Sequence, residues 1–386
     1  MAYLVNMQSM SKRELERALL KKLPEVLGEI GWSKDLRIQE VKSGGQDVGY
    51  DAEFKLSTPA GKAVRLRVDI KHDLRPSAFE SWVRMRRQAV AKAGTFPVLA
   101  VPAMSERLAD LCRSHGWSWY DLAGNCRIDV PGLLLVERRG IPSVYRPPRA
   151  KANLSSAAAG RVIRALLSPE HAGRIWTHRG VLDETSWKPD ETIWRSHPDQ
   201  PPVSIGLVNK VLRHLRDEGF VEDSERGGVR LRDPRGLLEA WNQAYRFDRH
   251  QRLNYFTLLK GAELEKALDK VRLFASGMVV YASFSAAERQ APHVRQEKTW
   301  LYAEAHCVGG LESNAKPVDS GENLVVLVPD DIGVLRTYLP ADSRLPSTDP
   351  AQTYVDLRHS GGRGEEAAQA ILEQVLLPAW KKAGLA

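Results

Sequence analysis

Residues 204–232 contain the pattern that most restricts what this chain can fold into. In the first half of the segment, apolar side chains recur at positions i, i+3, i+4 and i+7, which predicts a helix with one buried stripe. The stripe consists of Val208, Val211, Leu212 and Leu215. Gly219 then ends the helix, and two short strand-like runs flank Gly227 and Gly228, which predicts a tight hairpin.

The opposite side of the predicted helix is polar. Asn209 can pair with adenine through two hydrogen bonds, while Lys210 and Arg213 suit guanine or phosphate. Ser204 is a good N-cap, and the free N–H groups behind it can meet a phosphate. A helix followed by Gly-Phe-Val and a glycine hairpin resembles the winged helix-turn-helix of bacterial regulators. The candidate DNA-binding residues are Ser204, Gly206, Asn209, Lys210, Arg213, Arg226, Arg230 and Arg232. The alternative is a helix whose basic face is only solvated.

Composition narrows the classes that remain. The 386 residues carry 56 Lys and Arg against 48 Asp and Glu, a net charge of +8. No run approaches the roughly 18 apolar residues of a membrane-spanning helix, and the first residues lack a secretory signal pattern. Cys112, Cys126 and Cys307 lie far apart, which excludes a disulfide framework or a multi-cysteine zinc module. We therefore expect a cytoplasmic protein with no membrane partner.

Residues 1–140 predict an α/β domain with a mixed sheet, because helical and strand patterns alternate. Two alternating runs within 50–70 are separated by turn residues and predict a hairpin. Its strands bring Asp51 near Asp69 and Lys71. Two carboxylates can hold Mg²⁺, and a neighbouring lysine can activate the attacking water. The arrangement resembles the PD-(D/E)xK motif of restriction-endonuclease-like folds, in which these three residues would be catalytic and the two aspartates would bind the metal.

Three interpretations of this site stay open. The residues can be ordinary strand-end charges, the domain can be a nuclease fold that only binds nucleic acid, or it can cleave DNA with Mg²⁺. Gln88, on a predicted helix over 77–93, stands where some members of the fold carry a glutamine facing the site. The segment 62–92 has nine Lys or Arg against three acids, which suits phosphate contacts. Without cleavage, neither a cofactor nor enzymatic activity is expected.

Three stretches point to one family. Tyr-Asp-Leu-Ala-Gly-Asn occupies 120–125, Gln-Thr-Tyr-Val-Asp-Leu occupies 352–357, and Gly-Gly-Arg-Gly-Glu-Glu-Ala occupies 361–367. With the winged-helix segment between the first and the second, they resemble AbiEi-type proteins, the transcriptional regulators and antitoxins of type IV toxin–antitoxin systems. Read by its chemistry alone, the segment from Asp121 to Asn125 predicts a turn whose N–H groups bond to Asp121.

The resemblance implies a bacterial DNA-binding regulator, a repressor of its own operon and a partner toxin of nucleotidyltransferase type. We therefore expect a sequence-specific regulator that binds double-stranded DNA. A Mg²⁺-dependent nuclease and a purely protein-binding antitoxin are the alternatives, and a homodimer is left open.

The expected fold class is α/β (α+β) in three domains joined by one linker. They are a restriction-endonuclease-like mixed-sheet domain (1–140), a basic, Pro-rich linker (141–153), a winged helix-turn-helix (154–245) and a C-terminal α/β domain (246–386). The histidines show neither H-x-x-x-H nor a paired Cys/His spacing, so zinc is not expected.

Overall fold

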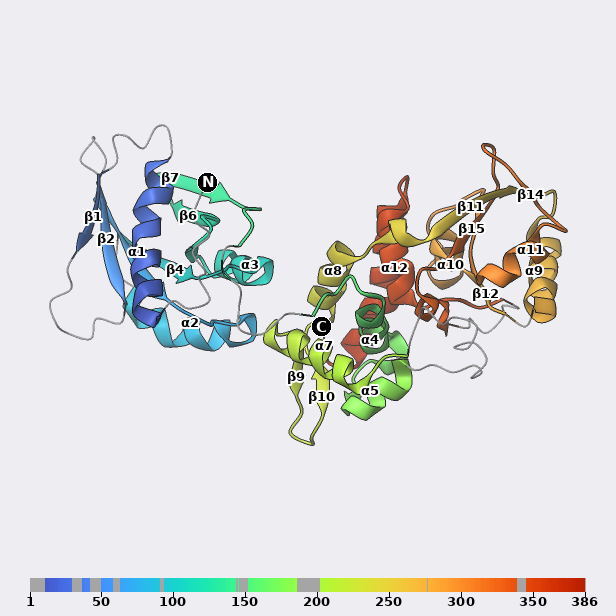
Figure 1. Ribbon diagram of the computed structural model, residues 1–386, viewed down its shortest axis with the longest axis horizontal. Coiled ribbons are helices and arrows are strands. Elements are labelled where there is room, and N and C mark those ends of the chain that lie inside the picture. The colour runs from blue at the N-terminus through green and yellow to red at the C-terminus, as the bar shows by residue number, and fades with distance from the viewer. Residues whose placement is uncertain are drawn as a thin grey trace. The chain divides into compact units, whose positions relative to one another are not determined.

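The structure is a computed structural model whose helices and strands form two compact units (Figure 1). The first unit comprises residues 1–150 and 217–219, and the second comprises residues 151–216 and 220–386. It describes residues 11–29, 37–41, 50–57, 63–90, 94–143, 145, 152–185, 202–275, 277–338 and 345–385. The expected α+β class is confirmed. No helix in these ranges is long and apolar enough to cross a membrane. Most of the expected linker, 141–153, lies outside the described residues.

The first unit contains a seven-stranded sheet in which the strands lie in chain order. The strands are β1 (Arg37–Val41), β2 (Ala52–Ser57), β3 (Ala63–Ile70), β4 (Thr95–Val101), β5 (Ser118–Asp121), β6 (Cys126–Val130) and β7 (Leu134–Arg138). β3, β4 and β5 run parallel, and the other neighbours are antiparallel. The expected hairpin is confirmed as β2–β3, with Ala52 opposite Val68. A turn at Gly132, where φ is 72°, separates β6 from β7.

Helices cover both faces of this sheet. They are α1 (Lys12–Gly28), α2 (Pro76–Val90) and α3 (Glu106–Ser114). α1 starts at a capping box, in which the side chains of Ser11 and Glu14 each accept the other residue's backbone N–H. Its leucines share a buried core with Phe54 and Val68, whereas α2 and α3 share a second core with Leu99 on β4. Side chains alternate between the two faces along a strand. Asp69 therefore lies on the face of the sheet that α2 covers, and its neighbour Val68 lies on the other face.

The second unit contains a mixed seven-stranded sheet with the order β14-β11-β15-β13-β12-β17-β16. Its strands are β11 (Gln251–Phe256), β12 (Val279–Tyr281), β13 (Thr299–Ala303), β14 (Lys316–Pro317), β15 (Leu324–Val328), β16 (Thr337–Tyr338) and β17 (Ser347–Thr348). The helices around it are α8 (Pro234–Ala244), α9 (Gly261–Ala275), α10 (Ser283–Gln290), α11 (Ala305–Leu311), α12 (Pro350–His359), α13 (Gly364–Ile371) and α14 (Leu377–Lys382). Two short 3-10 helices are η4 (Phe247–Arg249) and η5 (Ile332–Leu335). A π-helical segment, η6 (Leu372–Leu376), joins α13 to α14.

A small three-stranded sheet precedes this region and has the order β8-β10-β9. Along the chain come α4 (Ala157–Leu167), η3 (Pro169–His171), β8 (Ile175–Trp176), α5 (His178–Thr185), α7 (Ile205–Asp217), β9 (Val221–Asp223) and β10 (Val229–Leu231). One buried core runs through this segment and the larger sheet, since Val162 and Leu212 belong to the same cluster as Val325 and Val355. The regions that we expect to be separate domains, 154–245 and 246–386, therefore share their interior.

Candidate nucleic-acid interface

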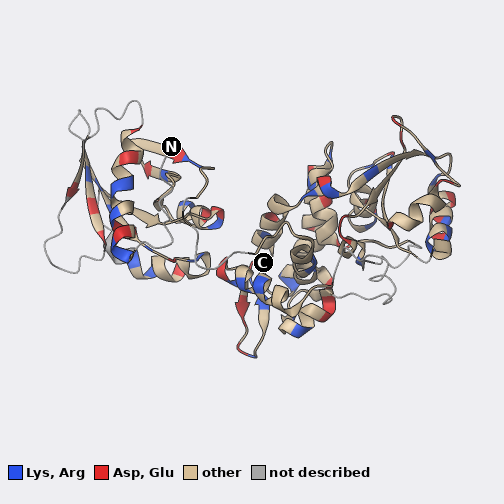
Figure 2. Ribbon diagram, in the orientation of Figure 1, with Lys and Arg blue, Asp and Glu red and all other residues tan. Residues whose placement is uncertain are grey.

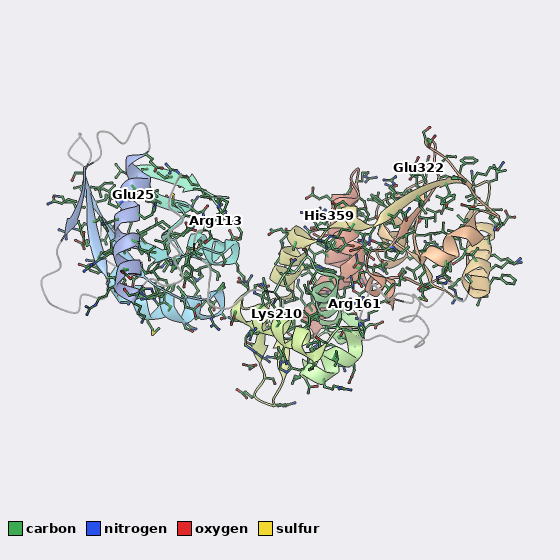
Figure 3. All side chains as sticks on the ribbon, viewed as in Figure 1. Glu25, Arg113, Arg161, Lys210, Glu322 and His359 are labelled. Atoms are coloured by element: carbon green, nitrogen blue, oxygen red, sulfur yellow. The ribbon has the colours of Figure 1, made fainter. Side chains whose placement is uncertain are left out.

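Helix α7 has the two faces that its sequence predicts. Val208, Val211, Leu212 and Leu215 are fully buried, which confirms the apolar stripe. On the other side, Gly206, Asn209 and Arg213 are exposed and Lys210 is half-buried. Figure 3 labels Lys210 on this helix, and Figure 2 shows basic residues along it. The packing thus fixes which side chains α7 presents to solvent.

The start of α7 leaves an accessible helix N-terminus. The hydroxyl of Ser204 accepts the N–H of Leu207 at 3.2 Å, as an N-cap does. Gly206 is exposed, and a Cβ added there would meet only the Ser204 hydroxyl, at 3.9 Å. A bulky partner can therefore approach the first turn closely, where the helix dipole favours negative charge.

The predicted glycine hairpin is confirmed as β9–β10, which Figure 1 shows projecting from the helices of the second unit. Gly227 and Gly228 have φ of 80° and 85°, values that favour glycine. Position 228 has a further constraint, because a Cβ there would lie 2.6 Å from the carbonyl oxygen of Trp176 on β8. Gly228 therefore also permits the close pairing of β8 with β10.

The three hairpin arginines differ in their surroundings. All are exposed, but Arg230 forms an ion pair with Glu222 at 2.5 Å, and Arg232 lies 3.9 Å from the same carboxylate. Arg226, at the tip, has no ion pair within the described part of the chain. Figure 2 marks acidic residues on β9 beside them. Arg226 is therefore the hairpin cation that can meet a phosphate without first leaving a partner.

The first part of the stretch 174–200 forms β8 and α5. Trp176 is buried in the core, and the guanidinium of Arg174 lies over its ring, 3.9 Å from the ring centroid. Trp187 and Trp194 lie outside the described residues. The described elements thus follow the order helix, strand, helix, helix and hairpin.

The three residues of the expected nuclease site meet at the end of β3. Asp51 precedes β2, and its Oδ2 accepts the N–H of Ile70 at 2.6 Å. The Nζ of Lys71 lies 3.8 Å from Oδ1 of Asp69. Gln88 lies on α2, but its side chain is outside the described residues. The residues expected at this site are therefore brought together, with one aspartate already bonded to the backbone.

Arg86, one of the basic residues of 62–92 that we expect to contact phosphate, instead changes the chemistry of this site. Nη2 of Arg86, on α2, lies 3.1 Å from Oδ1 of Asp69. Burial raises the pKa of Asp69 to about 6, although Arg86 and Lys71 oppose the rise, and Asp51 adds to it. The two cations thus already partly neutralise the carboxylate that a metal would need.

Much of the positive charge expected over 62–92 is engaged in ion pairs within the unit. Glu53, on β2, is buried and binds Arg65 at 2.8 Å and Arg67 at 3.1 Å. Asp69 forms ion pairs with Lys71 and Arg86, as described above. The excess of positive charge over 62–92 therefore overstates how many basic side chains can bind phosphate without first breaking an ion pair.

The Tyr-Asp-Leu-Ala-Gly-Asn stretch has the predicted turn chemistry. Asp121 is buried, and its Oδ1 accepts the N–H groups of Gly124 and Asn125, each at 3.0 Å. Its Oδ2 accepts the side-chain amide of Asn125 at 3.0 Å and the N–H of Met104 at 3.3 Å. Asn125 in turn exchanges hydrogen bonds with the backbone of Ile141. This is a structural role, as predicted.

A buried ion cluster in the second unit was not predicted from the sequence. Arg161 and Arg164 lie on α4, and Asp331 precedes η5; all three are buried. Nε of Arg161 donates to Oδ1 of Asp331 and Nη2 of Arg164 donates to Oδ2, both at 2.7 Å. Figure 3 labels Arg161. A Cβ on Gly333 would lie 2.7 Å from Nη2 of Arg164, so this glycine makes room for the pair.

The cluster continues into a chain of hydrogen-bonded polar side chains. Nη1 of Arg164 donates to Oε1 of Gln352 at 2.6 Å, and Nε2 of Gln352 donates to Oδ1 of Asp356 at 2.7 Å. The hydroxyls of Tyr245 and Tyr302 donate to the same oxygen at 3.0 and 3.1 Å. Two residues of the quoted stretch 352–357 thus belong to the core of this unit.

His250 completes the chain. Its Nδ1 accepts the N–H of Asp330 at 3.1 Å, so a neutral ring carries its proton on Nε2, which lies 2.7 Å from the Tyr245 hydroxyl. Burial lowers the pKa of His250 to about 4, and Arg164 adds to this. Burial raises the pKa of Asp356 to about 7 against its three hydrogen-bond donors.

Comparison with known proteins agrees with this division of the chain. Residues 230–377 match a family model described as "Transcriptional regulator, AbiEi antitoxin, Type IV TA system". The matched residues lie within the second unit, and the match agrees with the resemblance to AbiEi-type proteins that the sequence motifs imply. No curated protein and no solved structure matches the chain.

Proposed function

We propose that this chain is a transcriptional regulator that binds double-stranded DNA through a winged helix formed by α4, α5, α7 and the β8-β10-β9 sheet. The observation that carries the proposal is the exposed face of α7, where Asn209 and Arg213 stand opposite a fully buried apolar stripe. A face of this kind can enter the major groove, where amide and guanidinium groups read base edges. The AbiEi description of residues 230–377 adds regulation of transcription to DNA binding.

Each candidate residue has its own role in this proposal. Asn209, Lys210 and Arg213 would contact bases, while Ser204 and Gly206 would let a phosphate meet the start of α7. Arg226 would contact the backbone from the hairpin tip. Arg230 and Arg232 would contribute less, since each must first leave Glu222.

We expect Arg213→Ala to weaken binding to the chain's own upstream DNA by roughly 5- to 100-fold, since one good base contact supplies about 1–3 kcal/mol. Lys210→Ala should also reduce the slope of log affinity against log salt by about 1 if the amine meets a phosphate. Gel-shift titrations at several salt concentrations measure both. Lys266→Ala, an exposed lysine on α9, is the matched control and should bind normally.

Two results would contradict this proposal. One is the absence of a salt-sensitive complex with the upstream DNA. The other is normal binding by an Arg213→Ala, Lys210→Ala double variant. If the chain instead co-purified with a nucleotidyltransferase encoded next to it and bound no DNA, the protein-binding antitoxin would be the better description.

We propose that the first unit binds nucleic acid or supports the regulator without cutting DNA. Among the described residues, only two carboxylates meet at the end of β3; one is bonded to the Ile70 N–H and the other lies beside Arg86. Mg²⁺ prefers an octahedral set of oxygen ligands, so these residues fit it poorly. If the cytoplasmic regulator did use Mg²⁺, Asp51 and Asp69 would hold the ion and Lys71 would orient the water.

Plasmid DNA incubated with the protein and Mg²⁺ or Mn²⁺ is therefore expected to stay intact. Agarose gels that follow the supercoiled form over time measure this. The Asp69→Ala variant is the control for a contaminating nuclease. Cleavage by the unaltered chain that disappears in Asp69→Ala would establish the nuclease instead.

A further inference from the structure

Three side chains of types that can bind a metal gather at the start of α11, between Tyr302 and Asp331 in the sequence. Glu304 follows β13, and His306 and Cys307 lie in the first turn of the helix. One ligand atom from each residue lies within 4.8 Å of the other two. Within the described residues, no other group of three His, Cys, Asp or Glu side chains meets this condition.

Backbone geometry opposite the cluster leaves space between the ring and the thiol. Gly277 is buried, and a Cβ built on it would lie 2.5 Å from Sγ of Cys307 and closer still to Nε2 of His306. A residue with a side chain cannot occupy this position without displacing one of them. Because Zn–S and Zn–N bonds are about 2.3 and 2.0–2.1 Å long, a point just outside this position can satisfy both ligands.

The carboxylate is already oriented toward the same point. Oε2 of Glu304 accepts the N–H of Met278 at 2.6 Å and lies 4.0 Å from Nε2 of His306. Glu304 and Cys307 are buried, whereas the side chain of His306 is 43% exposed. A backbone hydrogen bond thus fixes one ligand, and the exposed histidine gives an ion a route from solvent.

We infer that Glu304, His306 and Cys307 bind a single Zn²⁺ ion, with solvent as the fourth ligand. A thiolate, an imidazole and a carboxylate together suit Zn²⁺ in a tetrahedral site, while Mg²⁺ and Ca²⁺ prefer oxygen ligands alone. All three ligands lie at the start of α11, which the Glu304–Met278 hydrogen bond already joins to the segment that leads into β12. The sequence shows no zinc spacing here because Glu-x-His-Cys is not among the usual paired motifs.

Binding would be coupled to loss of the thiol proton, since the thiolate is the ligand. The exchange releases one H⁺ from Cys307 for each ion bound and needs no oxidant or reductant. The other two cysteines, Cys112 and Cys126, are buried in the first unit and lie outside this cluster.

Titration of the full chain, freed of any tag and stripped with a chelator, tests the inference. In competition with a coloured chelator, we expect one equivalent of Zn²⁺ to bind, and Co²⁺ should give a thiolate charge-transfer band in the near ultraviolet. His306→Gln should weaken binding at least about tenfold, and Cys307→Ser should remove the band. His293→Gln, at a similarly exposed histidine, should leave both unchanged.

Gly277→Ala gives an independent test, because the added methyl group fills the space between the ligands. It should weaken binding while circular dichroism shows the fold retained; if this variant fails to fold, the exposed His306→Gln decides alone. Binding of less than one equivalent, equal affinity in His306→Gln, or Co²⁺ binding without the thiolate band would each overturn the site.

Discussion

Replacing Asp331 by alanine is expected to destabilise the second unit by about 3–5 kcal/mol, the usual cost of removing one partner from a buried ion cluster. The change leaves the guanidinium groups of Arg161 and Arg164 in the interior without their shared carboxylate. Burial alone would raise the pKa of Asp331, but the two arginines outweigh it and hold the pKa below its usual value, so the group is charged at neutral pH. Urea unfolding, followed by tryptophan fluorescence, measures the effect.

Two further variants separate the charge from the packing. Asp331→Asn keeps a group that can accept the Gly333 N–H but removes the charge, so most of the loss should remain. Exchanging all three residues for apolar ones of similar volume should recover stability, because apolar packing often replaces a buried ion cluster at little cost. Asp248→Ala breaks an exposed pair with Arg246 and should leave the unfolding midpoint unchanged. An equal effect of Asp331→Ala and Asp248→Ala would contradict this account.

The free energy of unfolding should depend on pH in opposite ways in two variants, one that lacks the titrating group of His250 and one that lacks that of Asp356. These two side chains are the ends of the His250–Tyr245–Asp356 chain. Asp356 has a folded pKa of about 7, above its unfolded value near 3.9, so its contribution is present below the unfolded pKa and is lost as pH rises through about 7. His250 has a folded pKa of about 4, below its unfolded value near 6.5, so its contribution is present above the unfolded pKa and is lost as pH falls toward 4.

In the unaltered chain the two effects largely cancel between about pH 4.5 and pH 6.5. The unfolded pair then holds one proton on the histidine, and the folded pair holds one on Asp356, so folding moves the proton with little net uptake. Relative to the unaltered chain, His250→Gln loses the histidine's contribution, so its stability should fall by roughly 3 kcal/mol from pH 4 to pH 6.5. Asp356→Asn removes the aspartate's contribution, so its stability relative to the unaltered chain should rise by roughly 4 kcal/mol from pH 4 to above pH 7.

Urea midpoints of the three proteins over this range test the assignment, and subtracting the unaltered chain removes the titration of every other group. The His250→Gln, Asp356→Asn double variant should again show a nearly flat difference. Parallel curves for both single variants would show that the two groups keep ordinary pKa values in the fold.

Local sequence patterns predicted the elements whose burial follows a simple period. The stripe of α7, the β2–β3 hairpin and the glycine turn after β9 all occur where expected, because each depends on neighbours within a few residues. The capping box at Ser11 belongs to the same group. Positions 279–284 show the limit of such patterns, because β12 ends at Tyr281 and α10 begins at Ser283, whose φ of 45° turns the chain.

The buried cluster was missed because its members are far apart in the sequence. Arg161 and Arg164 resemble surface residues of an ordinary helix, and nothing local shows that Asp331 and Gln352 will lie against them. A weak signal exists: α4 is apolar around most of its circumference, so two arginines three residues apart in it must reach a partner. The contact of Arg86 with Asp69 was missed for the same reason, since only the folded sheet brings these two side chains together.

The ion cluster also sets an order of events during synthesis. Arg161 and Asp331 are 170 residues apart, and Arg164 and Gln352 are 188 apart. At about 5–20 residues per second, the ribosome needs roughly 10–30 seconds to add the carboxylate after the first arginine. Until then α4 can form but cannot settle into its final surroundings. The segment around α4 therefore completes its fold only after most of the remaining chain has been made, late in translation.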